Sequence, residues 1–272
     1  MLHSPSTDSR ANHDGFSDGN DTNGGEWGAI SWRLCHVSAS LVTCCTEIHL
    51  LTDVRGLGID MVEIMVGPSK ISYRIHHQRL CAKVPVFDKM FNGGFKESSE
   101  RCAELPEDDP EAFNLFVEWL NTDRLTDFGP CNKNTKDRIL TGPIKLYCFA
   151  EKYCITDLMD YTISFLINAY NLSSCLPSCA QIQYSYENTA AASPIRKFMA
   201  WTVQYVIFSQ DDKGSWPSQG LATLLVSCED LTLDFLQLSR KLNGKTVLDP
   251  SRAEICQFHL HAKDKGCTVR GA

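Results

Sequence analysis

The sequence predicts an α+β fold, in which a cluster of helices flanks a small sheet and an additional helical region lies towards the C-terminus. Residues 61–66 and 71–75 are two short apolar runs around a turn, and the second alternates with a period of two, as a strand hairpin does. Residues 109–120 begin with Asp-Pro-Glu and continue with an apolar stripe at helical spacing. Residues 193–206 begin with Ser-Pro and show the clearest helical period in the chain.

The composition is that of a globular protein and argues against binding to nucleic acids or membranes. Hydrophobic residues make up 43% of the 272 residues, which is enough for a core, and the length fits one or two domains. The net charge of −7 and the lack of a long Lys/Arg run argue against nucleic acid as a direct ligand. No apolar run reaches the roughly 18 residues of a membrane span, so we expect no membrane insertion.

The 13 cysteines are odd in number and irregularly spaced. The first residues are polar and lack the apolar run of a signal peptide. A secreted disulfide framework is therefore not expected, and reduced thiols inside the cell, in the nucleus or cytoplasm, fit better.

The chain divides into three predicted parts. Residues 1–58 form a disordered or poorly defined arm, since residues 1–28 are rich in Ser, Asp, Asn and Gly and carry little apolar surface. Within this arm, residues 46–52 could form a helix leading into the domain. Residues 59–170 form the predicted α+β domain, and residues 171–272 form the C-terminal helical region.

The elements of the first half follow from local signals. Gly, Pro and Ser at 67–69 make the turn of the hairpin. Residues 76–83 form a short helix, and Pro85 begins the next one. Gly93 and Gly94 end that helix, since glycine takes the left-handed cap without penalty. Residues 101–105 form a further short strand.

The second half is helical, apart from one polar stretch. Residues 121–142 are polar and contain Gly and Pro, which predicts a long loop. Residues 146–153 then carry a helical apolar face, and Thr156 can cap another helix that reaches residue 169. After the helix at 193–206, a last helix covers residues 231–242. No repeat of 20 to 50 residues is present.

Several motifs occur in an order typical of one family. An Asp leads the first strand, a His begins the first short helix, a Leu and a Pro-x-Phe follow, and an acidic segment leads into the long helix. These are Asp60, His76, Leu80, Pro85, Phe87 and Leu105 to Phe113. Together they resemble a BTB/POZ domain of the kind common in fungal proteins, over about residues 59–170. Residues 186–198 also resemble the segment that follows this domain in many fungal members.

Two positions depart from the family pattern. Val84 stands before Pro85 where the family usually has Ser, which removes an N-cap hydroxyl worth about 1 kcal/mol. His77 stands where Lys is usual. Both weaken the case for a charged pocket at this place, and neither affects the core.

The resemblance implies a docking module without catalysis, whose partners are proteins. In members that dock a cullin scaffold, a hydrophobic-x-Glu motif follows the second short helix, and Phe95-Lys96-Glu97 stands there. The resemblance thus implies an adaptor for a cullin-type ubiquitin ligase, with Phe95 and Glu97 as partner-binding residues. The alternative is a self-associating homodimeric scaffold or transcriptional co-regulator without a ligase role.

No catalytic constellation is present, and we expect neither a small-molecule substrate nor a cofactor. Phosphate loops, nucleophile elbows and metalloprotease motifs are all missing from the sequence. The acidic run at 107–109 is interpreted as a loop and helix cap. His76 is interpreted as structural, hydrogen-bonded near the start of its helix.

The remaining cysteines and histidines have simple interpretations. Pro177 between Cys175 and Cys179 prevents a helical pair, which leaves ordinary thiols. Another group is formed by Cys256, His259, His261 and Cys267. Its order, Cys-x2-His-x-His-x5-Cys, is not a standard structural zinc pattern, so we expect no metal there. A thiol- or metal-dependent enzyme built on this group is the alternative from another functional class.

Overall fold

The computed structural model describes residues 60–126, 133–208, 216–242, 244–261 and 267. The predicted arm at 1–58, including its possible helix, lies outside these residues. All described residues belong to one compact unit. None of the described helices is both long enough and apolar enough to cross a membrane.

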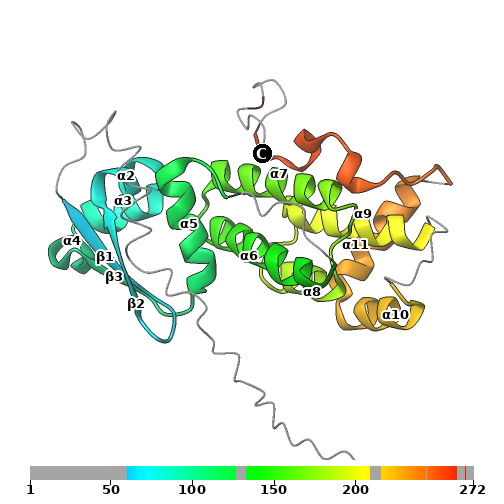
Figure 1. Cartoon of the computed structure of the whole chain (residues 1–272), viewed down its shortest axis with the longest axis horizontal. Coiled ribbons are helices and arrows are strands. Elements are labelled where there is room, and N and C mark those ends of the chain that lie inside the picture. Colours follow the sequence, from blue (N-terminus) through cyan, green and yellow to red (C-terminus); the bar gives the residue numbers. More distant parts are fainter. Residues whose placement is uncertain (1–59, 127–132, 209–215, 243, 262–266, 268–272) are drawn as a thin grey trace, which may run out of the picture. The chain divides into compact units, whose positions relative to one another are not determined.

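A three-stranded sheet forms one end of the described structure (Figure 1). Strand β1 (Met61–Val66) lies between β2 (Ile71–His76) and β3 (Cys102–Leu105). It pairs antiparallel with β2 and parallel with β3. The predicted hairpin and third strand are therefore confirmed. The turn after β1 requires glycine, because Gly67 has a φ of 73° and a Cβ there would lie 3.0 Å from Pro110 Cγ.

Three short helices and one longer helix complete this part of the fold. They are α2 (His77–Lys83), α3 (Pro85–Asn92), α4 (Lys96–Glu100) and α5 (Pro110–Thr122). Pro85 begins α3 as predicted. The glycine pair ends α3 as predicted too, with Gly94 in the left-handed region at a φ of 78°.

The core of this part is aromatic. Phe113 and Phe116 on α5 are fully buried, and their rings lie 5.4 Å apart between centroids. The ring of Phe149 lies 5.7 Å from Phe113 and 5.0 Å from Phe116. Tyr153 stacks on Phe87 of α3 at 5.4 Å. The apolar stripes predicted on separate segments therefore meet in one core.

The loop predicted over residues 121–142 is wrong in its second half, because α6 (Lys133–Lys152) begins ten residues earlier than expected. The helix continues through Pro143, which costs it one hydrogen bond, at about 3 kcal/mol. Leu140 and Ile144, one turn apart, are both fully buried. Their burial contributes about 3 to 6 kcal/mol, which offsets the cost of Pro143. Tertiary burial thus outweighs the helix-breaking signal.

The next helix, α7 (Thr156–Leu172), packs along α6. Thr156 is its first helical residue, and Ile155 occupies the N-cap without a side-chain hydrogen bond, so the predicted Thr156 cap is wrong. The apolar contacts of this helix explain why no cap is needed. Of its ten buried residues, seven are apolar or aromatic, including Leu158 and Phe165.

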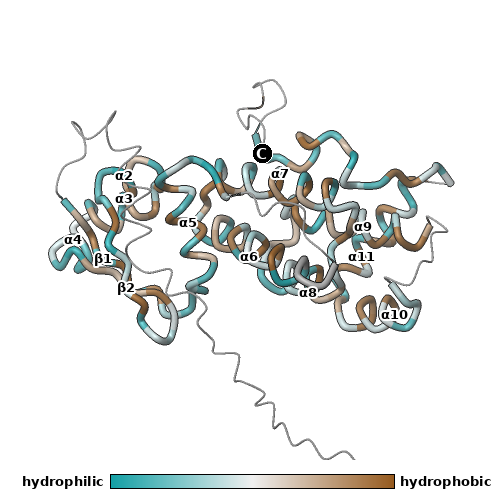
Figure 2. The backbone as a smooth tube through the Cα atoms, viewed as in Figure 1, coloured by the Kyte–Doolittle hydropathy of each residue, from teal (hydrophilic) through white to brown (hydrophobic). Residues whose placement is uncertain are grey.

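In the described residues after α7, four helices follow, and two of them were not expected from the sequence. The expected ones are α9 (Pro194–Phe208) and α11 (Glu229–Leu242), while α8 (Cys179–Glu187) and α10 (Ser218–Ser227) add to them. The chain then passes through two short 3-10 turns, η1 (Pro250–Arg252) and η2 (Ile255–Phe258). Coloured by hydropathy, the backbone shows hydrophobic stretches along these helices that alternate with hydrophilic ones (Figure 2).

The start of α5 is fixed by Asp109, as predicted. One carboxylate oxygen accepts hydrogen bonds from the backbone N–H groups of Glu111, at 2.7 Å, and Ala112, at 3.3 Å. The other lies 2.8 Å from Lys145 Nζ on α6. Burial favours a raised pKa for Asp109, but the Lys145 ammonium and the two N–H groups outweigh it and hold the pKa below its usual value.

Replacing Asp109 by Ala is expected to lower the free energy of unfolding by about 1 to 2 kcal/mol at neutral pH, because the cap is lost. A lowered folded-state pKa stabilises the protein above the unfolded pKa, and this contribution is lost as the pH falls through the folded pKa. The difference between Asp109→Ala and the wild type should therefore shrink below about pH 4. Urea unfolding at several pH values measures it. Asp109→Asn keeps a capping oxygen and should retain most of the stability, and equal stability of Asp109→Ala and the wild type at neutral pH would contradict the assignment.

Candidate functional site

Phe95 lies at the edge of the sheet-containing part, between α3 and α4. It is the N-cap residue of α4, with an extended backbone. Its side chain is 60% exposed, which is unusual for an aromatic ring. The ring lies across Gly93, since a Cβ added there would be only 2.9 Å from Phe95 Cε2. Phe95 is therefore exposed and held against the backbone of the glycine pair.

Glu97 stands in the first turn of α4 and is half-buried. The sequence placed this motif in a loop, but the structure makes it the beginning of a short helix. None of the residues of α4 is buried, and Lys96 pairs with Glu100 one turn later at 3.5 Å. The helix thus presents a polar surface directly beside the exposed ring of Phe95.

The end of α4 is tied to the sheet. Arg101 adopts a left-handed conformation, with a φ of 52°, and its carbonyl accepts the N–H of Glu63 on β1 at 2.9 Å. Its guanidinium donates to Asp60 at 2.7 Å. Asp60 also lies 3.4 Å from Nδ1 of His77. This connection fixes the position of α4 relative to β1. It also fixes the position of the surface formed by Phe95 and α4, called here the Phe95 surface.

The comparison with known families bears on these same elements. A family model of the BTB/POZ domain matches residues 60–169, from the residue before β1 to near the end of α7. The chain carries a BTB/POZ domain. No curated protein matches the chain.

A BTB/POZ domain is a protein-interaction domain, so residues 60–169 are a protein–protein interaction module. The α+β fold expected from the sequence is confirmed. Phe95, Gly93 and α4 all lie inside the BTB/POZ domain, and Phe95 is its most exposed aromatic side chain among the described residues.

The histidines of the BTB/POZ domain differ from the prediction. His76 occupies the N-cap of α2 without a side-chain hydrogen bond there, and its Nδ1 is buried with no hydrogen-bond partner among the described residues. The expected hydrogen bond of His76 at the helix start is therefore wrong. His76 is still the last residue of β2, paired with Met61, so its extended backbone continues the strand. The neighbouring His77 makes the contacts, with Asp60 and edge-on with Phe91 at 6.2 Å.

The acidic run before α5 is structural, as expected. Asp109 is the cap, and Glu107 is exposed. Asp108 has a role that the sequence did not reveal: it is buried, lies 3.0 Å from Lys152 Nζ and accepts the hydroxyl of Tyr153 at 2.7 Å. Burial and the Asp108 carboxylate raise the pKa of Tyr153, which keeps the phenol protonated as a donor.

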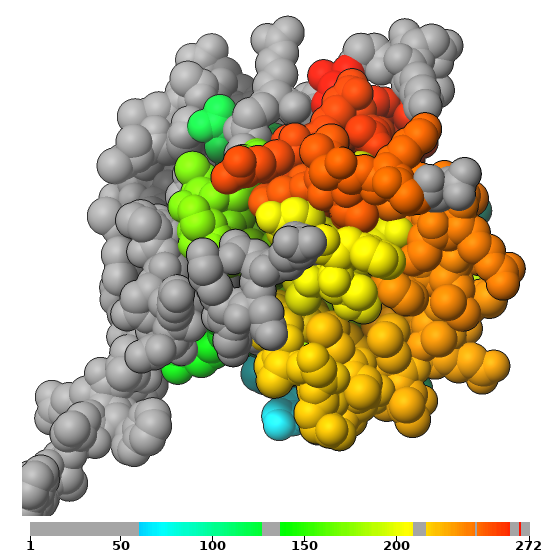
Figure 3. All heavy atoms as spheres, turned by 90° about the vertical axis from the view of Figure 1, so that its right-hand side faces the viewer, coloured from blue at the N-terminus to red at the C-terminus, as the bar shows by residue number. Residues whose placement is uncertain are grey.

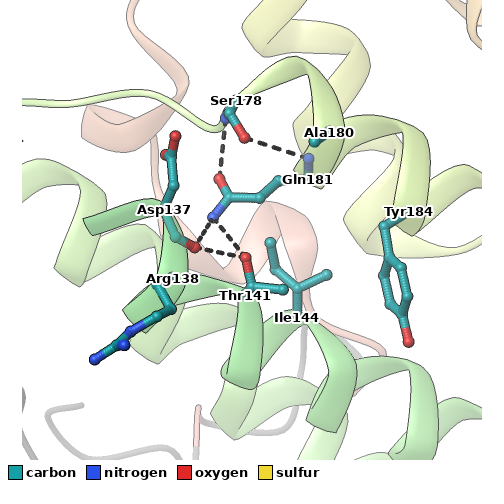
Figure 4. A pocket seen from close by; sticks show the side chains of 8 residues that line it. All are labelled: Asp137, Arg138, Thr141, Ile144, Ser178, Ala180, Gln181 and Tyr184. Carbon is teal, nitrogen blue, oxygen red and sulfur yellow. Dashed lines mark hydrogen bonds between the residues drawn. The ribbon is translucent and has the colours of Figure 1, made fainter. Parts of the chain in front are cut away.

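A pocket lies where α8 begins against α6, and its lining residues come both from the matched segment and from α8 after it (Figure 4). Its polar floor is Gln181, whose amide nitrogen donates to the carbonyl of Asp137 at 3.1 Å and to Thr141 at 3.4 Å. The amide oxygen accepts from the N–H of Ser178 at 2.9 Å and from Tyr170 at 3.0 Å. Both the amide oxygen and the amide nitrogen of Gln181 thus have hydrogen-bond partners within the protein, and these bonds hold α8 against α6.

The cysteines and histidines set aside in the sequence fall into two groups. Cys175 and Cys179 are half-buried, and Cys179 begins α8. The other four come together: the side-chain ligand atoms of Cys256, His259, His261 and Cys267 all lie within 4.8 Å of one another. The spacing of these residues in the sequence did not predict a metal site. The four side chains come together because the turn η2 packs on α7 and α9.

Proposed function

We propose that the chain is an adaptor for a cullin-type ubiquitin ligase, and that Phe95 and Glu97 of its BTB/POZ domain contact the scaffold. The observation that carries the proposal is the 60% exposed ring of Phe95, held across Gly93 at the start of α4. The resemblance of Phe95-Lys96-Glu97 to the docking motif of cullin-binding members supports it.

The two residues would contribute differently. A large aromatic ring that is already held in place loses little conformational entropy on binding, so it can act as an anchor worth about 2 kcal/mol or more in a partner's pocket. The Glu97 carboxylate would set orientation against a basic or hydrogen-bonding group. Lys96 and Glu100 form an ion pair, so their charges cancel, and Glu97 supplies the net negative charge of the helix.

The double substitution Phe95→Ala/Glu97→Ala is expected to weaken binding to a purified cullin scaffold by at least about tenfold, which corresponds to about 1.4 kcal/mol. Isothermal titration calorimetry measures this directly. Phe208→Ala is the matched control, since Phe208 is also an exposed phenylalanine, at 55%, but lies on α9. Wild-type protein that does not bind the scaffold, or a double variant that binds it equally well, would refute the adaptor role.

The second candidate is a self-associating scaffold or transcriptional co-regulator without a ligase role. Exposed apolar side chains on α11 favour it: Leu233 is 54% and Leu236 48% exposed, one turn apart. BTB/POZ domains also include self-associating ones. Light scattering over a range of protein concentrations separates the candidates, because a dimer that binds no cullin scaffold fits this one, whereas a monomer at all concentrations excludes it.

A further inference from the structure

Four potential metal ligands converge in the C-terminal segment, well away from the Phe95 surface in the sequence. His259 Nδ1 lies 2.9 Å from His261 Nε2 and 3.6 Å from Cys267 Sγ, and Cys256 completes a group contained within 4.8 Å. In tetrahedral zinc sites, Zn–N bonds of about 2.0 Å and Zn–S bonds of about 2.3 Å place neighbouring ligand atoms about 3.3 to 3.8 Å apart. The spacings of 2.9 and 3.6 Å lie near this range, and the widest separation, at most 4.8 Å, exceeds it by about 1 Å, so movements of about 1 Å would complete a tetrahedral ligand set.

The fold holds this group together by packing. Cys256 lies in the turn η2, whose last residue, Phe258, is fully buried. The ring of Phe258 meets Phe198 edge-on at 5.5 Å and lies 5.8 Å from Trp201, both on α9. Figure 3 shows the orange-red C-terminal segment lying over α9, in yellow. The buried ring thus anchors the segment that carries the ligands.

A buried carboxylate on α7 orients the ligand-bearing backbone. Asp160 is only 5% exposed, and it accepts the backbone N–H groups of Leu260 at 2.7 Å and His261 at 3.2 Å. Burying a carboxylate is costly unless it is hydrogen-bonded. The two N–H groups satisfy the Asp160 carboxylate, and the carboxylate in turn holds the segment 260–261 in place. Its negative charge also favours a cation nearby.

A serine on the same helix selects the tautomer of His259. Ser164 Oγ donates its hydrogen to the carbonyl of Asp160 at 3.0 Å, and it lies 2.7 Å from His259 Nε2. Because the hydroxyl hydrogen is already used, the serine oxygen accepts the Nε2–H of His259. The lone pair of the neutral ring is then on Nδ1, the atom that faces His261 and Cys267. Outer hydrogen bonds of this kind are typical of metal-ligating histidines.

We propose that Cys256, His259, His261 and Cys267 bind one zinc ion, which fastens the C-terminal segment to α7, the last helix of the BTB/POZ domain. Two thiols and two imidazoles are a ligand set that zinc prefers, and four protein ligands leave no open position, so the site is structural. On binding, the two thiols release their protons, and the two thiolates balance the charge of Zn²⁺.

The zinc content of the purified full-length chain tests the proposal. We expect about one zinc ion per chain by elemental analysis, and less than about a tenth of that in Cys256→Ser/Cys267→Ser. Cys154→Ser is the matched control, because Cys154 is exposed and lies in the turn between α6 and α7; it should retain the zinc. A zinc-free wild-type chain, or full zinc content in the double variant, would overturn the proposal.

Two further measurements keep the test valid if the double variant fails to fold. Cobalt added to the wild-type chain should give the ligand-field spectrum of a tetrahedral site with thiolate charge-transfer absorption, and a chelator should lower the Tm of the zinc-loaded chain. Ser164→Ala keeps all four ligands and should weaken zinc binding about 10- to 100-fold in competition with a chelator. An octahedral cobalt spectrum, or a Cys256–Cys267 disulfide in freshly purified protein found by mass spectrometry, would instead count against a zinc site.

Discussion

Replacing Phe116 by Ala is expected to lower the free energy of unfolding by about 4 kcal/mol, the typical cost of removing a fully buried phenylalanine. Phe116 has no exposed surface and stands at the centre of the aromatic core. Its ring lies 5.0 Å from Phe149, 5.4 Å from Phe113 and 6.1 Å from Phe87, so it connects α5 with both α6 and α3. Its removal leaves a cavity between three elements that cannot all close in, and it forfeits the ring-to-ring contacts.

The matched control makes the same chemical change at the surface. Phe95→Ala removes an identical side chain from a site that is 60% exposed, and it should change the free energy of unfolding by no more than about 0.5 kcal/mol. Urea denaturation followed by circular dichroism gives both values. Similar losses in the two variants would contradict the assignment of Phe116 to the core and of Phe95 to the surface.

Replacing Arg196 by Ala is expected to lower the free energy of unfolding by about 3 kcal/mol, because it removes the centre of a buried hydrogen-bond network. Arg196 is only 6% exposed. Its guanidinium donates to the carbonyls of Tyr186, at 2.6 Å, and Thr189, to the Thr189 hydroxyl at 3.2 Å, and to Asp230 of α11 at 2.8 Å. The Ala variant leaves these carbonyls without a donor in the interior.

Two comparisons identify the origin of the loss. Arg240 is an exposed arginine on α11, and Arg240→Ala should have an effect within about 0.5 kcal/mol. Arg196→Lys keeps the charge but lacks the planar fork, so it should recover only part of the stability. Full recovery in Arg196→Lys would mean that charge alone matters, and an unchanged Arg196→Ala would exclude a structural network.

Arg196 joins the helices that follow the BTB/POZ domain. Through its hydrogen bonds it connects three of them. It contacts the end of α8 through Tyr186 and α11 through Asp230, while lying on α9 itself. Its guanidinium also lies 4.9 Å from the ring of Tyr186.

The predictions that succeeded rest on short-range chemistry. The alternation after Ile71, the turn at Gly67 and the Asp109-Pro110 start are each encoded within a few residues, so the hairpin and α5 were predicted correctly. The helical period after Pro194 likewise predicted α9. Local signals of this kind act through backbone geometry that the neighbouring residues alone impose.

The predictions that failed depended on partners distant in the sequence. The polar start of α6 is helical because Leu140 and Ile144 find a buried surface, despite Pro143. The ring of His77, rather than that of His76, makes the local contacts, because Asp60 comes close to it from 17 residues away.

The sequence by itself determined the fold class, the BTB/POZ domain and the position of the Phe95-Lys96-Glu97 motif, because turns, caps and apolar periods are properties of contiguous residues. Only the tertiary structure decided that Phe95 is exposed and that the four ligands of the C-terminal segment meet. That meeting depends on Phe258 being buried against α9 and on Asp160 and Ser164 of α7, about 100 residues away. Burial and hydrogen bonding between distant segments, which ligand spacing alone cannot encode, bring the site together.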